Sequence, residues 1–354
     1  MRREPTDRIA HWEHMSNPDA VQLITGIDPW EKPHSAHKAL VERYPLDMLR
    51  LPADDKPIPR LSDDVTFLDE DGGKTARWGQ GKSWHWDWGS KFKTIEDVIT
   101  YQPLEHPDHR WMEPVGLDLS VSVEDLTVQF QEGLDGARRV VGDISLSVAG
   151  FYNTLFMWPL LTFGWELFLE LGAAYPDECK RLLRDFACLS RKVFQAWAGT
   201  DVEAVTCHDD ICYQRGPTFS PKWLREFIYP YYEEFWGCLK DAGKIVVFIC
   251  DGNIDDVADD ILACGADGWC SEPYTNWREL ARKHPDAVIA GDGDNRGLMA
   301  NDKDAIYAMV RGMADFGRAL PGYFFSVGNH IPWNVPAEAV KHYFEAAEEY
   351  GKRV

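Results

Sequence analysis

Residues 244–253 of this chain read KIVVFICDGN, an apolar run of strand length that ends in acidic and amide side chains. The same order of apolar run and polar end recurs at 202–210 (VEAVTCHDD), 287–296 (AVIAGDGDNR) and 323–330 (YFFSVGNH), and more weakly at 267–273 (DGWCSEP). Polar side chains at the carboxyl ends of successive strands are typical of the catalytic mouth of a (β/α) barrel. The pattern therefore predicts an enzyme.

Helical periodicity separates these strands. Apolar residues recur at three- and four-residue steps, and capping residues and glycines bound the segments, which predicts helices over 177–198, 221–242, 255–263, 277–282, 303–316 and 336–350. Strands that alternate with helices form a parallel sheet, since each crossover needs a helix. A doubly wound sheet is the rival, but there the polar residues would gather at one switch point.

The predicted fold class is therefore α/β, a TIM-like (β/α)8 barrel with an irregular N-terminal extension. A chain of 354 residues suits one such domain with insertions. We expect a single domain over 1–354, with about 141–354 forming most of the barrel and about 1–140 forming an elaboration rich in Pro, Asp and Gly.

The charge of the chain restricts its partners. With 37 basic and 58 acidic residues the net charge is −21, which disfavours nucleic acid and an anionic membrane surface as partners. The first residues lack the apolar core of a signal peptide. Eight cysteines without a CxxC pair indicate reduced thiols and a cytoplasmic location.

The predicted mouth gathers many acids. Its members are His208, Asp209, Asp210, Asp251, Glu272, Asp292, Asp294, Arg296, Asn329 and His330. Acids this numerous repel one another unless a metal ion, a bound proton or an arginine such as Arg296 or Arg215 offsets them. We expect Asp209, Asp210 and Asp294 to be catalytic. The alternative for any one of them is a helix cap or a hydrogen bond that braces a loop.

A zinc site is one solution to this repulsion. One histidine and two carboxylates with an open fourth position make a plausible catalytic zinc site, and His330, Glu272 and Asp251 are the predicted ligands. Cys250 is adjacent, but strand alternation from Phe248 turns it towards the helices, which indicates a buried structural thiol.

Aromatic residues suggest a substrate wall. Residues 84–88 read WHWDW, and a strand with period two would place the three tryptophans on one face. We expect Trp84, His85 and Trp86 to bind substrate, together with His208, Arg296 and Asn329. The alternative is a loop clamped onto the barrel surface.

Seven short motifs resemble the uroporphyrinogen decarboxylase superfamily, and more narrowly its methyltransferase-like branch. They are DDI at 209–211, GPTFSP at 216–221, LREF at 224–227, DGNI at 251–254, CGADG at 264–268, DNRGL at 294–298 and HIPWNVP at 330–336. The resemblance is good over 201–350 and weak over 151–200. It implies a TIM-like barrel, a cytoplasmic enzyme and methyl transfer to or from a corrinoid protein.

The chain departs from two members of that superfamily. The methyltransferases of the superfamily that act on thiols carry His-x-Cys before the Gly-Asn turn. At the same place this chain, which otherwise resembles them, has Ile249-Cys250-Asp251. The porphyrinogen decarboxylases carry an arginine-rich N-terminal motif, which is absent from this sequence. The resemblance therefore favours the oxygen-demethylating relatives, whose zinc sites contain carboxylate and histidine.

Three functions follow from this reading. The favoured one is a zinc-assisted methyltransferase that demethylates a small methylated substrate, of methoxy-aromatic type, onto the corrinoid of a separate partner protein. The second is a metal-free decarboxylase or lyase in which an acid such as Asp209 or Asp210 protonates a carbanion. The third is a non-catalytic binding barrel.

Overall fold

The computed structural model describes most of the chain. The described residues are 6–49, 51–61, 66–68, 74–78, 80–84, 92–109, 115–142, 145–146 and 148–353. Among the helices of these segments, none is long and apolar enough to cross a bilayer. All eight cysteines are free thiols, as the sequence predicts.

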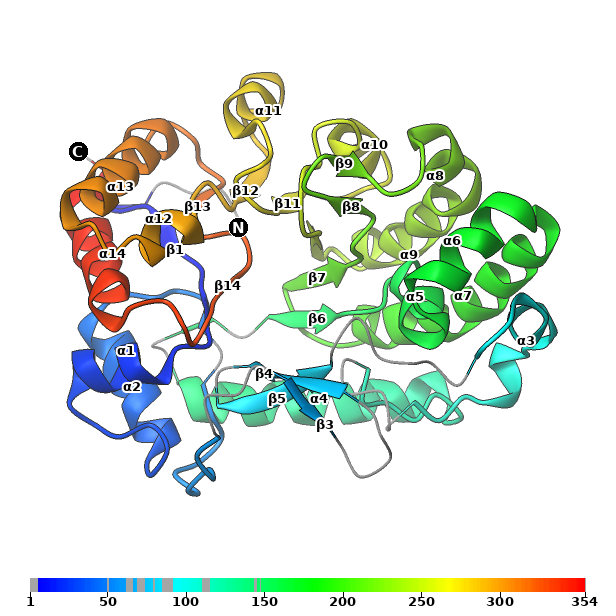
Figure 1. Cartoon of the computed structure of the whole chain (residues 1–354), viewed down its shortest axis with the longest axis horizontal. Helices are drawn as coiled ribbons and strands as arrows, with labels where there is room; N and C mark the ends of the chain where they lie inside the picture. The colour runs from blue at the N-terminus through cyan, green and yellow to red at the C-terminus, as the bar shows by residue number, and fades with distance from the viewer. Residues whose placement is uncertain are drawn as a thin grey trace.

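A parallel sheet of seven strands forms the centre of the molecule (Figure 1). Every neighbouring pair in it runs parallel. In spatial order the strands are β1 (Ala10–His11), β13 (Tyr323–Phe325), β12 (Val288–Ala290), β11 (Gly268–Cys270), β10 (Ile245–Ile249), β7 (Ala204–His208) and β6 (Ala149–Phe151).

An irregular segment around Met48 joins the two edges of this sheet. On one side the Asp47 backbone N–H donates to the His11 carbonyl at 2.9 Å, and Met48 forms a parallel bridge with Trp12. On the other side the Leu146 N–H donates to the Asp47 carbonyl at 2.7 Å. The ring thus has eight positions in chain order, which confirms the predicted TIM-like barrel.

Helices surround the strands on all sides in Figure 1. The ring consists of α1 (Pro18–Thr25), α2 (Pro33–Arg43), α4 (Val123–Val141), α7 (Pro176–Ala198), α8 (Pro221–Phe227), α9 (Tyr229–Asp241), α10 (Ala258–Ala263), α11 (Trp277–Lys283), α13 (Lys303–Gly317) and α14 (Ala337–Tyr350). Shorter elements elaborate it: α3 (Ile95–Thr100), the 3-10 turn Pro103–Glu105, α5 (Met157–Phe163), α6 (Trp165–Ala174) and α12 (Asn295–Met299).

In the described part of the chain, two strand pairs and one three-stranded sheet lie outside the central sheet. They are β2 (His14–Met15) with β14 (His330–Ile331), β8 (Cys212–Tyr213) with β9 (Gly216–Pro217), and β3 (Thr66–Leu68), β4 (Lys74–Trp78) and β5 (Gly81–Trp84) as an antiparallel sheet. The first two follow barrel strands directly along the chain. They therefore belong to the loops at the carboxyl ends of the strands, where a barrel enzyme binds its substrate.

Strand alternation divides the core into two layers. Inside the barrel, a small apolar cluster gathers Met48, Val247, Cys270, Val288, Ala290 and Phe324. Between sheet and helices, a much larger cluster includes Val246, Phe248 and Cys250 from β10 and its end. Successive residues of a strand face opposite sides, so this assignment follows from period two. Cys250 is fully buried on the helix side, which confirms its predicted orientation.

The predicted helices are confirmed with two corrections. The helix expected over 255–263 begins at Ala258 as α10, because residues 255–257 form a turn. Where one helix was expected over 221–242, the structure has two, α8 and α9, which meet at Ile228. Pro230 lies in the first turn of α9, and a proline there cannot donate the hydrogen bond that a continuous helix requires. The predicted start is correct, because the Ser220 hydroxyl accepts the Trp223 N–H at 3.2 Å.

Candidate active site

The site lies where β7 and β10 end, side by side. His208 is the last residue of β7 and pairs in register with Ile249 of β10. Along β10, Val247 and Ile249 contact the cluster inside the barrel, and Asp251 continues this alternation. The Asp251 backbone N–H then donates to Asp210 Oδ1 at 3.0 Å, which joins the two strand ends.

His208, Asp210 and Asp251 form a compact group of nitrogen and oxygen donors. Each of the three residues offers one ligand atom, and these atoms all lie within 4.8 Å of one another. Among the described residues, this is the one group of three His, Cys, Asp or Glu side chains that meets this criterion. His208 Nε2 lies 2.9 Å from Asp210 Oδ1, and the two side chains are 17% and 8% exposed. The group is therefore largely shielded from water.

Burial and mutual repulsion shift the pKa values in this group. Burial, followed by the negative charge of Asp210, raises the pKa of Asp251 to about 8. Burial also opposes the charged forms of His208 and Asp210, but their mutual attraction outweighs it, so the pKa of His208 is raised and that of Asp210 is lowered. Asp251 is therefore mostly protonated at neutral pH, because its ionisation would add an uncompensated negative charge to a buried group.

A divalent cation fits this group. Two carboxylates and one imidazole offer three protein donors, the number that a catalytic zinc site uses when its fourth position stays open for substrate. A cation there would offset the repulsion between Asp210 and Asp251. No thiolate takes part, because Cys250 faces the helices. The donor set therefore belongs to the oxygen- and nitrogen-ligated class.

Two of the residues predicted as metal ligands lie beside this group. Glu272 Oε2 accepts the Gly252 N–H at 2.8 Å, and Glu272 Oε1 accepts from Asn329 Nδ2 at 3.5 Å. Asn329 Oδ1 in turn lies 2.9 Å from His330 Nδ1. Burial, and then the nearby His14, lower the pKa of His330 to about 3, so its ring is neutral. Of the three predicted ligands, Asp251 belongs to the compact group, whereas Glu272 and His330 do not.

Asp209, predicted to be catalytic, faces away from this group. Its carboxylate accepts backbone N–H groups from Leu155, Phe156 and Met157 at 2.5 to 2.8 Å, and the Tyr232 hydroxyl at 2.7 Å. Burial raises the pKa of Asp209 to about 7, although these four donors favour its charged form. Asp209 thus fixes the start of α5 against β7.

Asp294 and Arg296 pair with each other. Asp294 caps α12 by accepting the Arg296 N–H at 2.8 Å, and its carboxylate also accepts from the Arg296 guanidinium at 2.7 to 3.0 Å. The guanidinium lies over the Tyr274 ring at 4.7 Å. Asp292 interacts with Arg278 at 3.4 Å. Arginine pairing therefore offsets both acids: Arg296 was an expected partner, whereas Arg278 was not predicted.

The aromatic segment predicted to bind substrate is only partly described. Trp84 ends β5, where its backbone pairs with Thr75 of β4. His85, Trp86 and the side chain of Trp84 lie outside the described residues. A different aromatic residue adjoins the site: the Tyr152 ring lies 4.2 Å from the His208 ring, at a tilt of 52°. Tyr152 follows β6, a strand that the sequence reading missed.

The comparison with protein families now adds an identity. The family model of uroporphyrinogen decarboxylase (URO-D) matches residues 151–350, more than half of the chain. The chain belongs to the URO-D family. This confirms the resemblance read from the short motifs. Among curated proteins, no sequence matches this chain.

Of two solved structures compared with this chain, one has a similar fold. A methyltransferase from Methanosarcina mazei superimposes with a TM-score of 0.61 at 16% sequence identity, over 98% of this chain and 95% of that one. At this identity the likeness shows a shared fold. A sugar phosphate isomerase/epimerase from Parabacteroides distasonis ATCC 8503 reaches a TM-score of 0.34 at 12% identity, over 66% and 78% of the two chains, too low to support an inference. URO-D family members can thus share this barrel with methyltransferases.

Proposed function

We propose that this URO-D family protein is a methyltransferase that removes a methyl group from a small methylated substrate and passes it to the corrinoid of a partner protein. The observation that carries the proposal is the compact group of His208, Asp210 and Asp251 at the mouth of the barrel. The fold that it shares with a Methanosarcina mazei methyltransferase supports the same conclusion. A methoxy-aromatic ether is the substrate class that we propose.

The proposed metal is zinc, held by His208, Asp210 and Asp251. When bound, it would act as a Lewis acid on the oxygen that loses the methyl group. The chain prepares this site without thiolates, which suits an oxygen-containing substrate better than a thiol. The hydrogen bond from the Asp251 backbone to Asp210 fixes one ligand from each of two strands.

Residues around the group would orient the substrate. Tyr152 packs against His208 and so both restrains that imidazole and offers an aromatic face to a substrate ring. Glu272 and Asn329 form a second polar wall, in which Glu272 accepts hydrogen bonds from Asn329 Nδ2 and from the Gly252 N–H. We infer that Asn329 and the neutral His330 contact the substrate from this wall. Arg296 would contact the substrate at the outer edge of the site.

The experiment is a single-turnover assay of methyl transfer. The purified protein, loaded with zinc, is mixed with a panel of methoxylated aromatics and a reduced corrinoid, and methylcobalamin is followed by its visible spectrum. We expect Asp251→Asn to lower the rate by about a hundredfold or more, since it removes a ligand that holds the catalytic centre. Asp286→Asn, at an exposed carboxylate on the turn that precedes β12, is the matched control and should leave the rate unchanged.

The outcomes separate the proposed function from its rivals. Methylcobalamin formation by the wild type and by Asp286→Asn, but not by Asp251→Asn, supports it. Release of carbon dioxide from carboxylated aromatics, with no methylcobalamin from any ether, would identify a decarboxylase instead. Tight binding of an ether without turnover would identify a binding barrel.

A further inference from the structure

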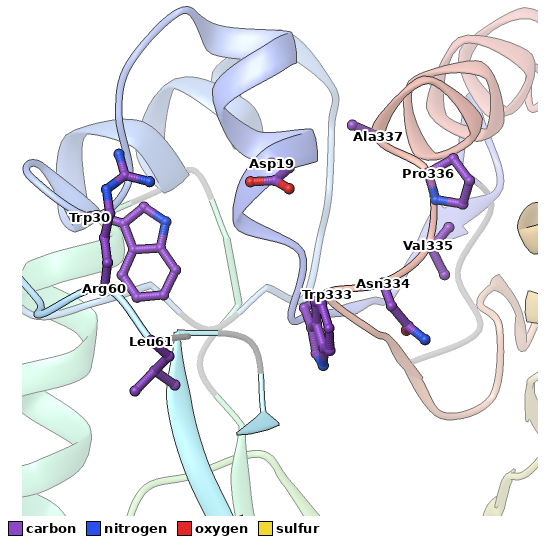
Figure 2. Close-up of a pocket in the computed structure, with 9 residues that line it drawn as sticks. All are labelled: Asp19, Trp30, Arg60, Leu61, Trp333, Asn334, Val335, Pro336 and Ala337. Carbon is purple, nitrogen blue, oxygen red and sulfur yellow. The ribbon is translucent and has the colours of Figure 1, made fainter. Parts of the chain in front are cut away.

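A pocket lies on the rim of the barrel, beside the loops that follow its first and last strands. It has a volume of about 470 Å³, within the range of small-molecule sites. Figure 2 shows Trp30, Arg60 and Leu61 on one side, Trp333 and Asn334 on the other, and Asp19 above the space between them. Val335, Pro336 and Ala337 complete the wall at the start of α14.

Hydrogen bonds hold the walls of this pocket in place. Asn17 is buried, and its Oδ1 accepts the Ala20 N–H at 2.8 Å at the start of α1. Its Nδ2 donates to the carbonyls of Pro332 and Val335 at 2.9 and 2.8 Å. One side chain thus ties the helix that carries Asp19 to the loop that carries Trp333. A preformed pocket loses less entropy when a ligand binds.

The side of the pocket that carries Trp30 and Arg60 is also held by hydrogen bonds. The Ile58 N–H donates to the Trp30 carbonyl at 2.8 Å. Arg60 forms an ion pair with Asp28 at 2.5 Å, and its guanidinium lies over the Trp30 ring at 5.7 Å. The chain therefore already places a cation near this indole. Aromatic faces attract cations through the negative potential of the ring.

The charges around the pocket favour a cationic ligand. Of the described residues that line it, Asp19 and Arg60 are charged, and Asp28 offsets the charge of Arg60. Two helices begin here, α1 and α14, and each start carries about half a positive charge. Asp19 and Glu338 lie in these first turns. The three carboxylates are those of Asp19, Asp28 and Glu338. Together with the Arg60 guanidinium and the two helix starts, they leave a net charge of about −1.

We propose that this pocket binds a small organic monocation, a quaternary or protonated ammonium group with apolar substituents. Asp19 supplies the opposite charge, and the partly exposed Trp333 supplies the aromatic surface, whereas Trp30 is only 3% exposed and adds little accessible surface. Among the described residues that line the pocket, none belongs to the group of His208, Asp210 and Asp251, so the two sites have different linings. The proposal does not depend on methyl transfer, because its test is binding alone.

The test compares two probes of nearly equal shape by titration calorimetry at constant ionic strength. Choline is the cation, and 3,3-dimethylbutan-1-ol is its neutral counterpart, in which carbon replaces nitrogen. We expect wild-type protein to bind choline at millimolar concentration and at least about fivefold more tightly than the alcohol, since a cation over an indole with a nearby carboxylate gains roughly this factor.

Variants locate the binding. Asp19→Asn should weaken choline binding by about fivefold and leave the alcohol unaffected. Asp304→Asn is the matched control, because Asp304 is likewise an exposed acid in the first turn of a helix, α13, away from the pocket. Trp333→Leu should weaken choline binding more than Trp333→Phe, which keeps an aromatic ring.

Three results would overturn the proposal. The first is no choline binding at about 50 mM, roughly fiftyfold above a dissociation constant of about 1 mM. The second is equal affinity for the neutral alcohol, and the third is an equal effect of Asp19→Asn and Asp304→Asn. Melting temperatures of the variants identify any loss caused by unfolding. A misfolded Asp19→Asn would leave the comparison of the two probes on the wild type as the deciding measurement.

Discussion

Asp209 and Asp210 are adjacent in sequence but act in different parts of the molecule. Asp210 pairs with His208 at the mouth, whereas Asp209 accepts four hydrogen bonds on the helix side of the barrel. The sequence predicted that both lie at the end of a strand, and this is confirmed by β7. It could not separate their roles, because three of the four donors to Asp209 lie more than fifty residues away in the chain and the fourth, Tyr232, lies 23 residues away.

We predict a structural role for Asp209 that mutation can measure. Asp209→Asn keeps the shape but replaces one acceptor oxygen by a donor that faces buried N–H groups. It should lower the free energy of unfolding by about 3 kcal/mol. Tyr232→Phe removes one of the four donors and should cost about 1 kcal/mol. Urea denaturation followed by circular dichroism gives both values.

A catalytic role for Asp209 would give a different pattern. In that case Asp209→Asn would abolish methyl transfer while the urea midpoint stayed near that of the wild type. The structural role predicts the opposite order of effects: a lower midpoint, with residual activity in the fraction that stays folded. Tyr232→Phe serves as the control for packing, because it leaves the carboxylate in place.

At the scale of elements, the sequence predicted the helices whose positions depend on neighbouring residues in the chain. The long amphipathic helix α7 and the capped start of α13 follow from apolar spacing and from Asp302, whose carboxylate accepts the Ala305 N–H at 3.1 Å. The short helix α12 was missed, although Asp294 at its N-cap was a usable signal. The strands β1 and β6 were missed as well, because two or three residues carry no periodicity.

The connection between α1 and the loop before α14 gives a prediction for one element. Asn17→Ala removes the cap of α1 and two donors to loop carbonyls, so it should lower the free energy of unfolding by about 2 kcal/mol. Asn17→Asp keeps the cap, because a carboxylate also accepts the Ala20 N–H, but it loses the donors. Asn17→Asp should therefore lower the free energy of unfolding less than Asn17→Ala does if the cap contributes more than the two hydrogen bonds to the loop. It should lower it at least as much if the loop hydrogen bonds contribute more.

Hydrogen exchange distinguishes these cases. Loss of the cap exposes the first amides of α1, whereas loss of the donors loosens residues 332–335. Faster exchange in both segments for Asn17→Ala, and in the loop alone for Asn17→Asp, is the expected result. Unchanged exchange in both segments for both variants would contradict the view that this side chain joins the two walls of the rim pocket.

At the scale of the whole molecule, the sequence predicted the barrel but not how it closes. Motifs at five strand ends, with helices between them, were enough to indicate eight parallel positions. The closing segment near Asp47 is irregular, and its place depends on hydrogen bonds to β1 and to the stretch before β6. The compact group of His208, Asp210 and Asp251 shows the same limit. Its residues were all identified as mouth residues, but which three converge depends on the register of β7 and β10.

Zinc binding is the prediction that concerns the molecule as a whole. The chain has a net charge of −21, so any divalent cation will screen it to some extent. A specific site adds a larger effect, because a ligand that binds only the folded state stabilises it by about 2.7 kcal/mol at a concentration one hundred times its dissociation constant. We therefore expect micromolar zinc to raise the melting temperature, whereas calcium at the same concentration does not.

Variants show whether the stabilisation arises at the mouth. Asp251→Asn or His208→Ala should abolish the rise in melting temperature with zinc, since each removes one of three ligands. Glu272→Gln should retain it if Glu272 lies outside the metal shell, and should lose it if the ligands are the trio of His330, Glu272 and Asp251. A rise that survives Asp251→Asn would place the zinc elsewhere on this acidic surface. A chelator should return the wild type, but not Asp251→Asn, to a lower melting temperature, because only the intact site has a metal to lose.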